Sequence, residues 1–500
     1  MKINFTKLLA LAAMTTMSLS LWAENEQPIP QNMGDYIVLG SATGTENFAT
    51  YISTKENCTV DANLRDGSNY YTIGTIQNAE TATLAIDVTT GAEGAGDYVF
   101  GFKTGASNGA ASTVNITIQK SGVETPTTIA TDEVISTNNN WSPSIPHYFA
   151  VNDLDASSVY TITIAATKTG GQYCGNFGQF YFHKSSQYPT MPTDGTTTID
   201  LSGGTYYNSQ YNNDGVISGL DNGGYMDNIL LNNTTEGYFK LKFNVQDYKA
   251  EGTLTATIYN LSSDVAETSN TICVTSTGDK TLAFGNIVTT GMKRIRFDFT
   301  GTKTNGTIFN YKNVSFLSYT PASYDALPIT GAATLDLNQE GAVFNKCSYE
   351  AGNSNIGNVY NGGYADNYYV YNSNSSANYT LYANIPWYKK GGTFTITITD
   401  VATNTIEATE TSPAITGTGN IHFDITNAIT PGLKKIRFDF IKADEEDYLF
   451  NLNNVSFTKK SNPTALDNAN ANTKAVKIIR NGQLVIIRDG VEYNALGSKL

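Results

Sequence analysis

The sequence predicts an all-β chain of three tandem β-sandwich (jelly-roll) domains followed by a small C-terminal β-hairpin tail. Apolar and polar residues alternate in many short runs, such as Thr393-Phe-Thr-Ile-Thr-Ile-Thr, which is typical of half-buried antiparallel strands. Clusters of Gly, Asn and Asp separate these runs and indicate turns. Several sequence landmarks also recur at the spacing of whole domains, and units of that length with many short strands indicate sandwiches.

The first residues predict a secretory signal peptide over residues 1–23. Lys2 precedes an apolar run that begins at Leu8, and small residues end the segment near Ala23. Elsewhere no apolar run approaches the roughly 20 residues that cross a bilayer as a helix, so no transmembrane segment is predicted. We therefore expect an extracellular protein that is secreted or held at the cell surface.

The composition narrows the class of partner. The chain has 500 residues, too many for one compact core, and only 15% of them are charged. Thr, Asn, Gly and Tyr are frequent, which favours sheet surfaces and turns over long helices. The formal net charge of -14 argues against a nucleic-acid phosphate backbone as the main partner.

A duplicated frame divides the chain into domains. Segments 291–316 and 432–457 share G-x-K-[RK]-I-R-F-D-F followed by F-N-x-x-N-V-S-F, and the upstream element N-G-G-Y-x-D-N occurs at 222–228 and 361–367. A shared order of landmarks indicates duplication of a whole domain. A weaker copy of the strand, gap and strand pattern lies at 159–183. We therefore predict domains at 34–186, 196–320 and 332–459, called modules 1, 2 and 3 below, joined by linkers with Pro and Gly.

The order of these landmarks resembles the carbohydrate-binding modules of families 6 and 35, over most of residues 196–457 and more weakly in module 1. The resemblance implies β-sandwiches that bind glycans. Such modules stack a sugar face on an aromatic ring, and amide side chains donate to and accept from the sugar hydroxyls.

Position by position, the resemblance implies a loop-end site in each module. Its residues are Trp141 and Asn176 in module 1, Tyr225, Asn310 and Asn313 in module 2, and Tyr364, Asn451, Asn453 and Asn454 in module 3. Packing beside the sandwich is the alternative for the rings, and turn chemistry is the alternative for the asparagines. Trp387, in Asn384-Ile-Pro-Trp-Tyr-Lys-Lys, is a further candidate for an exposed anchor.

These families also often hold a structural calcium ion, at a position where Asp200 and Asp336 stand in this chain. Carboxylate oxygens are the ligands that calcium prefers, so a structural calcium is the one cofactor considered. Cys58 and Cys174 fall in one predicted domain, either as a disulfide or as two small buried side chains. Cys273 and Cys347 are each alone in a module and are expected in cores.

The C-terminal segment 474–500 predicts a small meander, because Asn481-Gly482 and Asp489-Gly490 favour tight hairpin turns. It resembles the C-terminal sorting signals of Bacteroidetes type IX secretion substrates, which implies the secretion machinery as a partner. A structural hairpin that caps module 3 is the alternative.

The resemblance thus leads us to expect a non-catalytic protein that binds polysaccharide. The chain has no H-E-x-x-H, G-x-S-x-G or P-loop motif, so no enzyme activity is predicted. One alternative is a structural or adhesive surface protein that has kept the fold and lost sugar binding. The other is a glycoside hydrolase, whose paired carboxylates are assembled only by folding.

Overall fold

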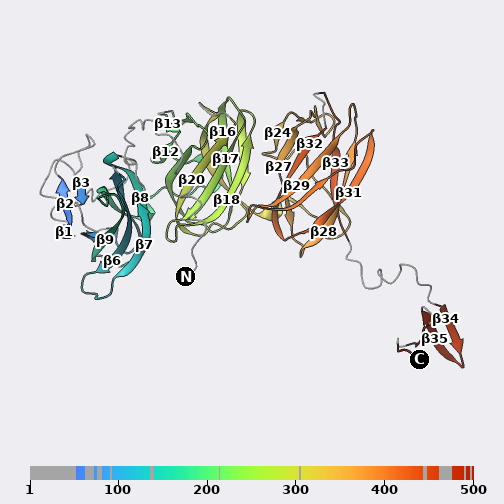
Figure 1. The fold of residues 1–500 in the computed structure, drawn as a ribbon, viewed down its shortest axis with the longest axis horizontal. Helices are drawn as coiled ribbons and strands as arrows, with labels where there is room; N and C mark the ends of the chain where they lie inside the picture. Colours follow the sequence, from blue (N-terminus) through green and yellow to red (C-terminus); the bar gives the residue numbers. More distant parts are fainter. Residues whose placement is uncertain are drawn as a thin grey trace. The chain divides into compact units, whose positions relative to one another are not determined.

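The computed structural model describes residues 52–61, 72–75, 81–90, 93–107, 109–135, 140–212, 214–302, 306–442, 447–460, 476–488, 491–495 and 498–500. Within these ranges the regular structure consists of β-strands and two short 3-10 helices, η2 (Ser185–Gln187) and η3 (Pro321–Ser323). The sheets come as three successive pairs and a small C-terminal sheet, so the predicted all-β sandwich fold is confirmed (Figure 1). The predicted signal peptide lies outside the described residues.

The sheets of module 1 have five strands each. The first has the order β1 (Ile52–Glu56), β4 (Thr81–Thr89), β9 (Val159–Gly170), β6 (Ala111–Lys120), β7 (Thr127–Ile135). The second has the order β2 (Cys58–Asp61), β3 (Thr72–Thr75), β10 (Asn176–Lys184), β5 (Gly96–Ala106), β8 (Asn140–Leu154). Burial alternates along β6, as the period-two pattern predicts, and the inward residues Ile116, Ile162 and Phe102 form part of the core.

The middle pair of sheets comes from module 2. One sheet contains β12 (Thr205–Tyr207), β15 (Tyr225–Asn233), β20 (Gly291–Gly301), β17 (Gly252–Asn260) and β18 (Val265–Val274). The other contains β13 (Gln210–Tyr211), β14 (Ile217–Ser218), β21 (Phe309–Tyr319), β16 (Tyr238–Tyr248) and β19 (Gly278–Ala283), with β11 (Asp194–Thr198) beside β21.

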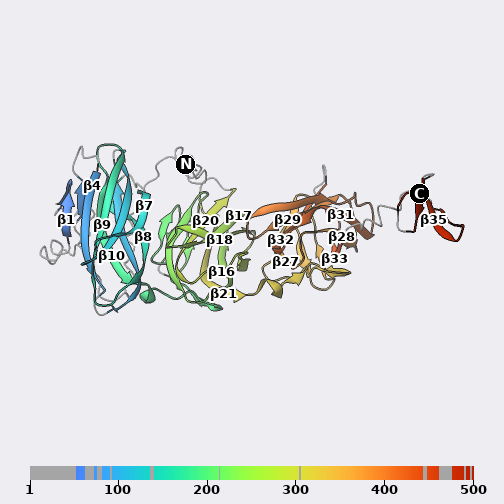
Figure 2. The same cartoon turned by 90° about the horizontal axis from the view of Figure 1, so that it is seen from below.

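The third pair comes from module 3 together with β22 from the preceding linker, and its two layers are seen in Figures 1 and 2. One sheet has the order β22 (Asp325–Ala326), β27 (Gly363–Asn372), β32 (Gly432–Ile441), β29 (Thr393–Asp400), β30 (Thr405–Thr411), with β24 (Val343–Asn345) beside β27. The other has the order β23 (Ala332–Thr334), β33 (Asn453–Lys459), β28 (Ala377–Ile385), β31 (Gly419–Ile429). A separate hairpin joins β25 (Ser348–Glu350) to β26 (Asn355–Gly357).

The C-terminal tail forms a three-stranded sheet of β34 (Val476–Arg480), β35 (Gln483–Arg488) and β36 (Val491–Asn494). Asn481 has a positive φ of 53° in the turn between β34 and β35, which Asn and Gly tolerate best. The second predicted turn, at 489–490, lies outside the described residues.

The chain divides into two compact units whose border runs through the strands of module 2. The first unit contains residues 1–236, 244–267 and 288–316, and the second contains residues 237–243, 268–287 and 317–500. The three module boundaries and the extent of the tail therefore stay predictions. Among the described residues, no helix is long and apolar enough to cross a membrane.

The repeated N-G-G-Y-x-D-N element has a local structural role in both copies. Asn228 and Asn367 adopt left-handed backbone conformations, with φ of 62° and 66°. At each position the register with the neighbouring strand shifts, between Met226 and Ile229 in β15 and between Ala365 and Tyr368 in β27. The Asp-Asn pair thus forms a β-bulge, and Asn is among the residues that tolerate this conformation best.

Candidate functional site

The two tyrosines predicted to stack on sugars are packed against arginines. Tyr364 has 5% of its surface exposed, and the guanidinium carbon of Arg437 lies 3.7 Å from its ring centroid. Tyr225 is half-buried, stacks on Tyr207 at 5.3 Å and has the guanidinium of Arg296 at 4.2 Å. These contacts favour the packing alternative, and a sugar contact through either ring stays a prediction.

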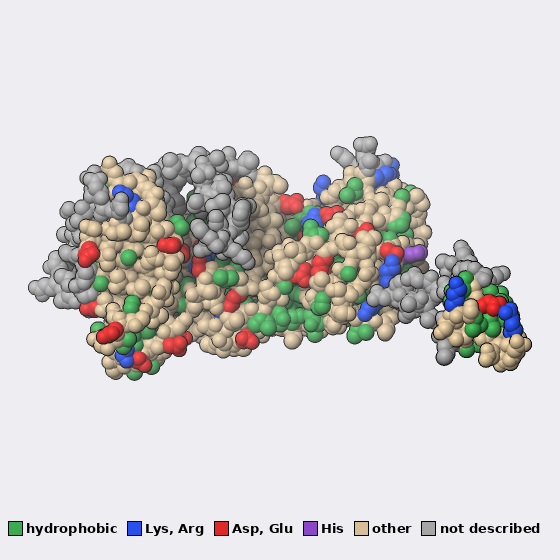
Figure 3. Space-filling model, turned by 60° about the horizontal axis from the view of Figure 1, so that its bottom comes forward, with side chains coloured by type: hydrophobic (Ala, Val, Ile, Leu, Met, Phe, Trp, Pro, Cys, Tyr) green, Lys and Arg blue, Asp and Glu red, His purple; other side chains and the backbone are tan. Residues whose placement is uncertain are grey.

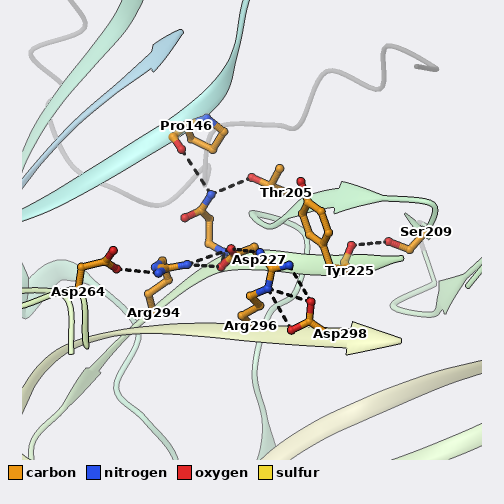
Figure 4. Close-up of polar contacts among 10 residues, drawn as sticks. Pro146, Thr205, Ser209, Tyr225, Asp227, Asp264, Arg294, Arg296 and Asp298 are labelled. Atoms are coloured by element: carbon orange, nitrogen blue, oxygen red, sulfur yellow. Dashed lines mark hydrogen bonds and ion pairs between the residues drawn. The ribbon is translucent and has the colours of Figure 1, made fainter. Parts of the chain in front are cut away.

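The arginines are held by aspartates of the same repeated elements, as Figure 4 shows for Asp227 in module 2. In module 2 both Arg294 and Arg296 donate to Asp227, at 2.9 and 3.0 Å. In module 3 Arg437 donates to Asp366 at 3.3 Å. The element therefore supplies a carboxylate that fixes the arginine over the tyrosine ring.

In module 1 the predicted pair comes together. Asn176 donates from Nδ2 to the carbonyl oxygen of Trp141 at 2.8 Å, and Trp141 meets the ring of Tyr173 edge-on at 5.2 Å. Because Asn176 is 6% exposed, this part of its amide serves the fold. Trp141 is half-buried, and its contact with a sugar stays a prediction.

The predicted asparagines of modules 2 and 3 have different surroundings. Asn313 and Asn454 are exposed with φ of 55° and 49°, which is the turn chemistry of the alternative. Asn453 accepts a hydrogen bond from Asn384 at 2.9 Å. Asn310 is half-buried and its Oδ1 has no hydrogen-bond partner among the described residues. Asn451 remains, and it belongs to a cluster at the loop end of module 3.

This module 3 loop-end cluster consists of three aromatic rings and three polar side chains. They are Trp387, Tyr448, Tyr360, Glu350, Asn358 and Asn451.

The three rings of the cluster lie at one loop end. Tyr448 lies between the other two, 4.4 Å from the Tyr360 ring and 6.3 Å from the Trp387 ring, which it meets edge-on. Trp387 is 42% exposed. An aromatic ring with this much exposed surface is available to stack with a ligand.

Backbone hydrogen bonds through Leu449 fix the loops that carry the rings. The Leu449 N–H donates to the carbonyl of Val359 at 2.8 Å, and its carbonyl accepts from Lys389 at 3.0 Å. The next turn is held by the Asn451 N–H, which donates to the Trp387 carbonyl at 2.9 Å. The rings are therefore positioned before any ligand arrives.

Glu350 lies within the polar part of the cluster. Its Oε1 accepts from the Asn358 amide at 3.1 Å and its Oε2 accepts from the Asn451 amide at 3.4 Å. Gly357 leaves room for the Glu350 carboxylate, since a Cβ at residue 357 would lie 2.2 Å from the Glu350 carboxyl carbon. An ionised carboxylate has further lone pairs, so it can also accept hydrogen bonds from ligand hydroxyls.

An ion pair flanks the rings. Lys389 donates to Asp447 at 2.7 Å and its ammonium lies 5.6 Å from the Tyr448 ring centroid. The hydrogen bond from Lys389 lowers the pKa of Asp447, and the hydrogen bond with Tyr448 raises the pKa of Tyr360. Near neutral pH, Asp447 is ionised and Tyr360 keeps its proton.

Module 2 provides an internal comparison, because its landmarks align with those of module 3. Where module 3 has Tyr360, Trp387 and Tyr448, the aligned positions of module 2 are polar, namely Asp221, Asp247 and Thr307. The duplicated fold therefore does not need aromatic side chains at these positions. A comparison of the two copies at the residues that flank each landmark would have indicated Tyr360 and Tyr448, which the family resemblance did not.

The remaining predicted groups show local contacts. Asp200 accepts from the Ser202 N–H at 2.9 Å and Asp336 accepts from the Asn338 N–H at 2.8 Å, as in turns. Among the described residues, no group of three or more His, Cys, Asp or Glu side chains gathers to hold a metal. Cys174 is buried, and the disulfide with Cys58 stays a prediction because the Cys58 side chain lies outside the described residues.

No protein-family model matches the chain, and no curated protein sequence matches it. Among solved structures, the tandem of two CBM22 modules from Paenibacillus barcinonensis Xyn10C is similar with a TM-score of 0.22 at 11% identity, covering 58% of this chain and 99% of that one. The tandem CBM51 modules of a family 98 glycoside hydrolase from Streptococcus pneumoniae SP3-BS71 give 0.17 at 8% identity, covering 54% and 97%. A structure of Sulfolobus turreted icosahedral virus gives 0.22 at 12% identity, covering 87% and 98%. At these TM-scores the likenesses carry no argument about function.

Proposed function

We propose that this chain is a secreted or cell-surface, non-catalytic polysaccharide-binding protein, and that the module 3 loop-end cluster is its binding site. The observation that carries the proposal is the exposed ring of Trp387, which meets Tyr448 edge-on and whose carbonyl accepts from the N–H of Asn451, the residue whose amide donates to Glu350. A pyranose face presents polarised C–H bonds to an aromatic ring, and neighbouring amide and carboxylate groups bond its hydroxyls. Both kinds of group are present at one loop end.

The charge states of the cluster support binding over hydrolysis. A glycosidase needs one carboxyl group that keeps its proton near neutral pH so that it can act as an acid. The pKa of Asp447 is lowered by the hydrogen bond from Lys389, and Glu350 accepts from two amides. The hydrogen bond from Lys389 stabilises the ionised form of Asp447, which suits a carboxylate that accepts hydrogen bonds.

The export route is part of the proposal. The predicted signal peptide takes the chain across the inner membrane, and the C-terminal sheet β34–β36 serves as the sorting signal that its sequence resembles. A three-stranded sheet of this size is marginally stable alone, which suits a segment that another protein reads.

A second candidate is a structural or adhesive surface protein. It is favoured by the packing of Tyr225 and Tyr364 under arginines, since these contacts give both rings a role within the fold.

A glycan array with the mature full-length chain tests the proposal. We expect signals on a set of polysaccharides that Trp387→Ala reduces and that Asp247→Ala, at the aligned position of module 2, leaves unchanged. Equal signals from the wild type and Trp387→Ala would reject this site, and no signal from the wild type would favour the structural role.

A further inference from the structure

Two equivalent positions of modules 2 and 3 each contact the module that precedes them in the chain. In the first compact unit, Leu261 and Met292 of module 2 pack with Val99 of module 1 and Tyr188 of the linker. These four side chains are buried, each with 5% or less of its surface exposed.

In the second compact unit, the corresponding cluster contains Val401 and Leu433 of module 3, Ala283 of module 2 and Tyr324 of the linker. The register of the strands aligns the two clusters. Asn260, just before Leu261, pairs with Lys293 of the G-x-K frame, and Asp400, just before Val401, pairs with Lys434 of the same frame.

The polar contacts of the two junctions also correspond. The Asn228 amide faces the carbonyl oxygen of Pro146 in module 1 at 3.5 Å, a contact drawn in Figure 4. The aligned Asn367 amide donates to the carbonyl of Thr281 in module 2 at 2.9 Å. Both asparagines close the repeated N-G-G-Y-x-D-N element.

At each junction a second asparagine, which belongs to the preceding module, donates to the following module. Asn152 of module 1 donates to Ser262 of module 2 at 3.2 Å. Asn286 of module 2 donates to the carbonyl of Ala402 in module 3 at 2.9 Å, and Ala402 is the residue aligned with Ser262.

Buried polar groups give the second junction additional specificity. The Tyr369 hydroxyl donates to Asn367 Oδ1 at 2.6 Å and accepts from the Asn270 amide at 3.2 Å. Lys435 donates to Asn270 Oδ1 at 3.2 Å and to the Thr271 carbonyl at 2.9 Å. Breaking this network while it stays buried is costly, since unpaired buried polar groups lose their solvation without a replacement.

Gly285 shows how closely the modules approach. A Cβ at Gly285 would lie 2.4 Å from the backbone nitrogen of Ala402. The aligned residue of module 3 is Thr426, which is exposed. A side chain is therefore tolerated within the module and excluded only where another module follows.

Two other aligned positions of module 3 are charged. Ala283 and Tyr319 of module 2 correspond to Asp424 and Lys460, which form an exposed ion pair at 2.7 Å. Polar outer faces are what end a series of stacked repeats.

We propose that the N-G-G-Y-x-D-N element is a docking element that seats each module on the module before it in the chain, and that module 3 is the cap that ends the series. The partner of the element is the preceding module. That module offers an apolar patch, which receives Leu261 and Met292 of module 2 or Val401 and Leu433 of module 3. It also offers a backbone carbonyl, which accepts from the element's last asparagine. The proposal is independent of sugar binding.

Hydrogen exchange of the full-length chain, followed by mass spectrometry, tests the docking. Gly285→Thr places a side chain across the second junction, and we expect exchange in β27 and in residues 268–287 to accelerate by at least about tenfold, which corresponds to about 1.4 kcal/mol of lost protection. The control Thr426→Gly, at the free face, should leave both segments unchanged. Ala402→Glu blocks the same contact from the module 3 side and should reproduce the effect of Gly285→Thr.

The interior strands β5 and β29 distinguish undocking from unfolding. Faster exchange at the junction in both variants, with β5 and β29 unchanged, supports the proposal. Unchanged exchange at the junction in Ala402→Glu would overturn it, whether or not Gly285→Thr disturbs its own module. Equal acceleration at the junction and in β29 would also overturn it.

Discussion

Replacing Lys434 with methionine is expected to destabilise module 3 more than any surface ion-pair change. The Lys434 side chain is fully buried, and its ammonium donates to Asp400, to Glu407 at 3.0 Å and to Thr430 at 2.8 Å. The two carboxylate side chains are 10% and 9% exposed. Methionine fills much of the same space but leaves both carboxylates buried without their cation.

The expected loss follows from that burial. Removing one partner of a buried ion pair costs about 3–5 kcal/mol, because the remaining charge keeps its desolvation penalty. The aligned Lys293 of module 2 pairs with one carboxylate, Glu267, since Asn260 stands where module 3 has Asp400. We therefore expect Lys293→Met to cost less than Lys434→Met.

The pH dependence of the stability of module 3 tests the same buried pair in a second way. Burial alone would raise the pKa of Asp400, but the hydrogen bond from Lys434 and the bonds from Thr403 leave it lowered overall. A carboxyl group whose pKa is lowered by folding contributes stability at pH values above its unfolded-state pKa, about 3.9. This stability is lost as the pH falls through the folded-state pKa. In Lys434→Met this acid-dependent loss should disappear.

Urea unfolding of the full chain, followed by tryptophan fluorescence, measures the loss. Trp141→Phe leaves Trp387 as the reporter of module 3 in the mature chain. Lys389→Met, which removes the exposed pair with Asp447, is the control and should change the free energy of unfolding little. A loss for Lys434→Met no larger than that of Lys389→Met would refute the reasoning from burial.

Three further outcomes are expected. Trp387→Ala should weaken polysaccharide binding about five- to tenfold in calorimetric titration, because it removes about 1 kcal/mol of stacking and the associated burial. Unchanged affinity would exclude the Trp387 ring from the site. Burial lowers the pKa of His147 to about 4, so the stability of module 1 should fall by up to about 3 kcal/mol as the pH drops from about 6.5 to about 4. Urea titrations at several pH values measure this fall, and His147→Asn should remove the dependence of stability on pH in that range. Burial raises the pKa of the Cys347 thiol to about 12, so alkylation at pH 8 should label it only after unfolding, and labelling of the folded chain would contradict its burial.

Much of the fold was predictable because the burial pattern of a strand is local. The alternation in Phe239-Lys-Leu-Lys-Phe-Asn-Val is reproduced as alternating burial along β16. The bulge at Asn228 and Asn367 was harder to predict, since the sequence shows a repeated Asp-Asn but not the register shift that it causes.

The site was less predictable because it depends on what lies across the sheet. Tyr364 follows a Gly pair as a binding residue would, yet the neighbouring strand β32 places Arg437 over its ring. Tyr360, Trp387 and Tyr448 are far apart in sequence and are brought together by backbone hydrogen bonds between their loops, among them those of Leu449. Neither contact can be read from residue spacing alone.

The most direct test of the proposed function is calorimetric titration of the mature chain with a polysaccharide that it binds on the array. We expect one class of sites per chain, lost in Trp387→Ala/Tyr448→Ala and retained in Trp141→Ala and Tyr225→Phe. Retained binding in Trp387→Ala/Tyr448→Ala, together with its loss in Trp141→Ala, would contradict the account and place the site in module 1.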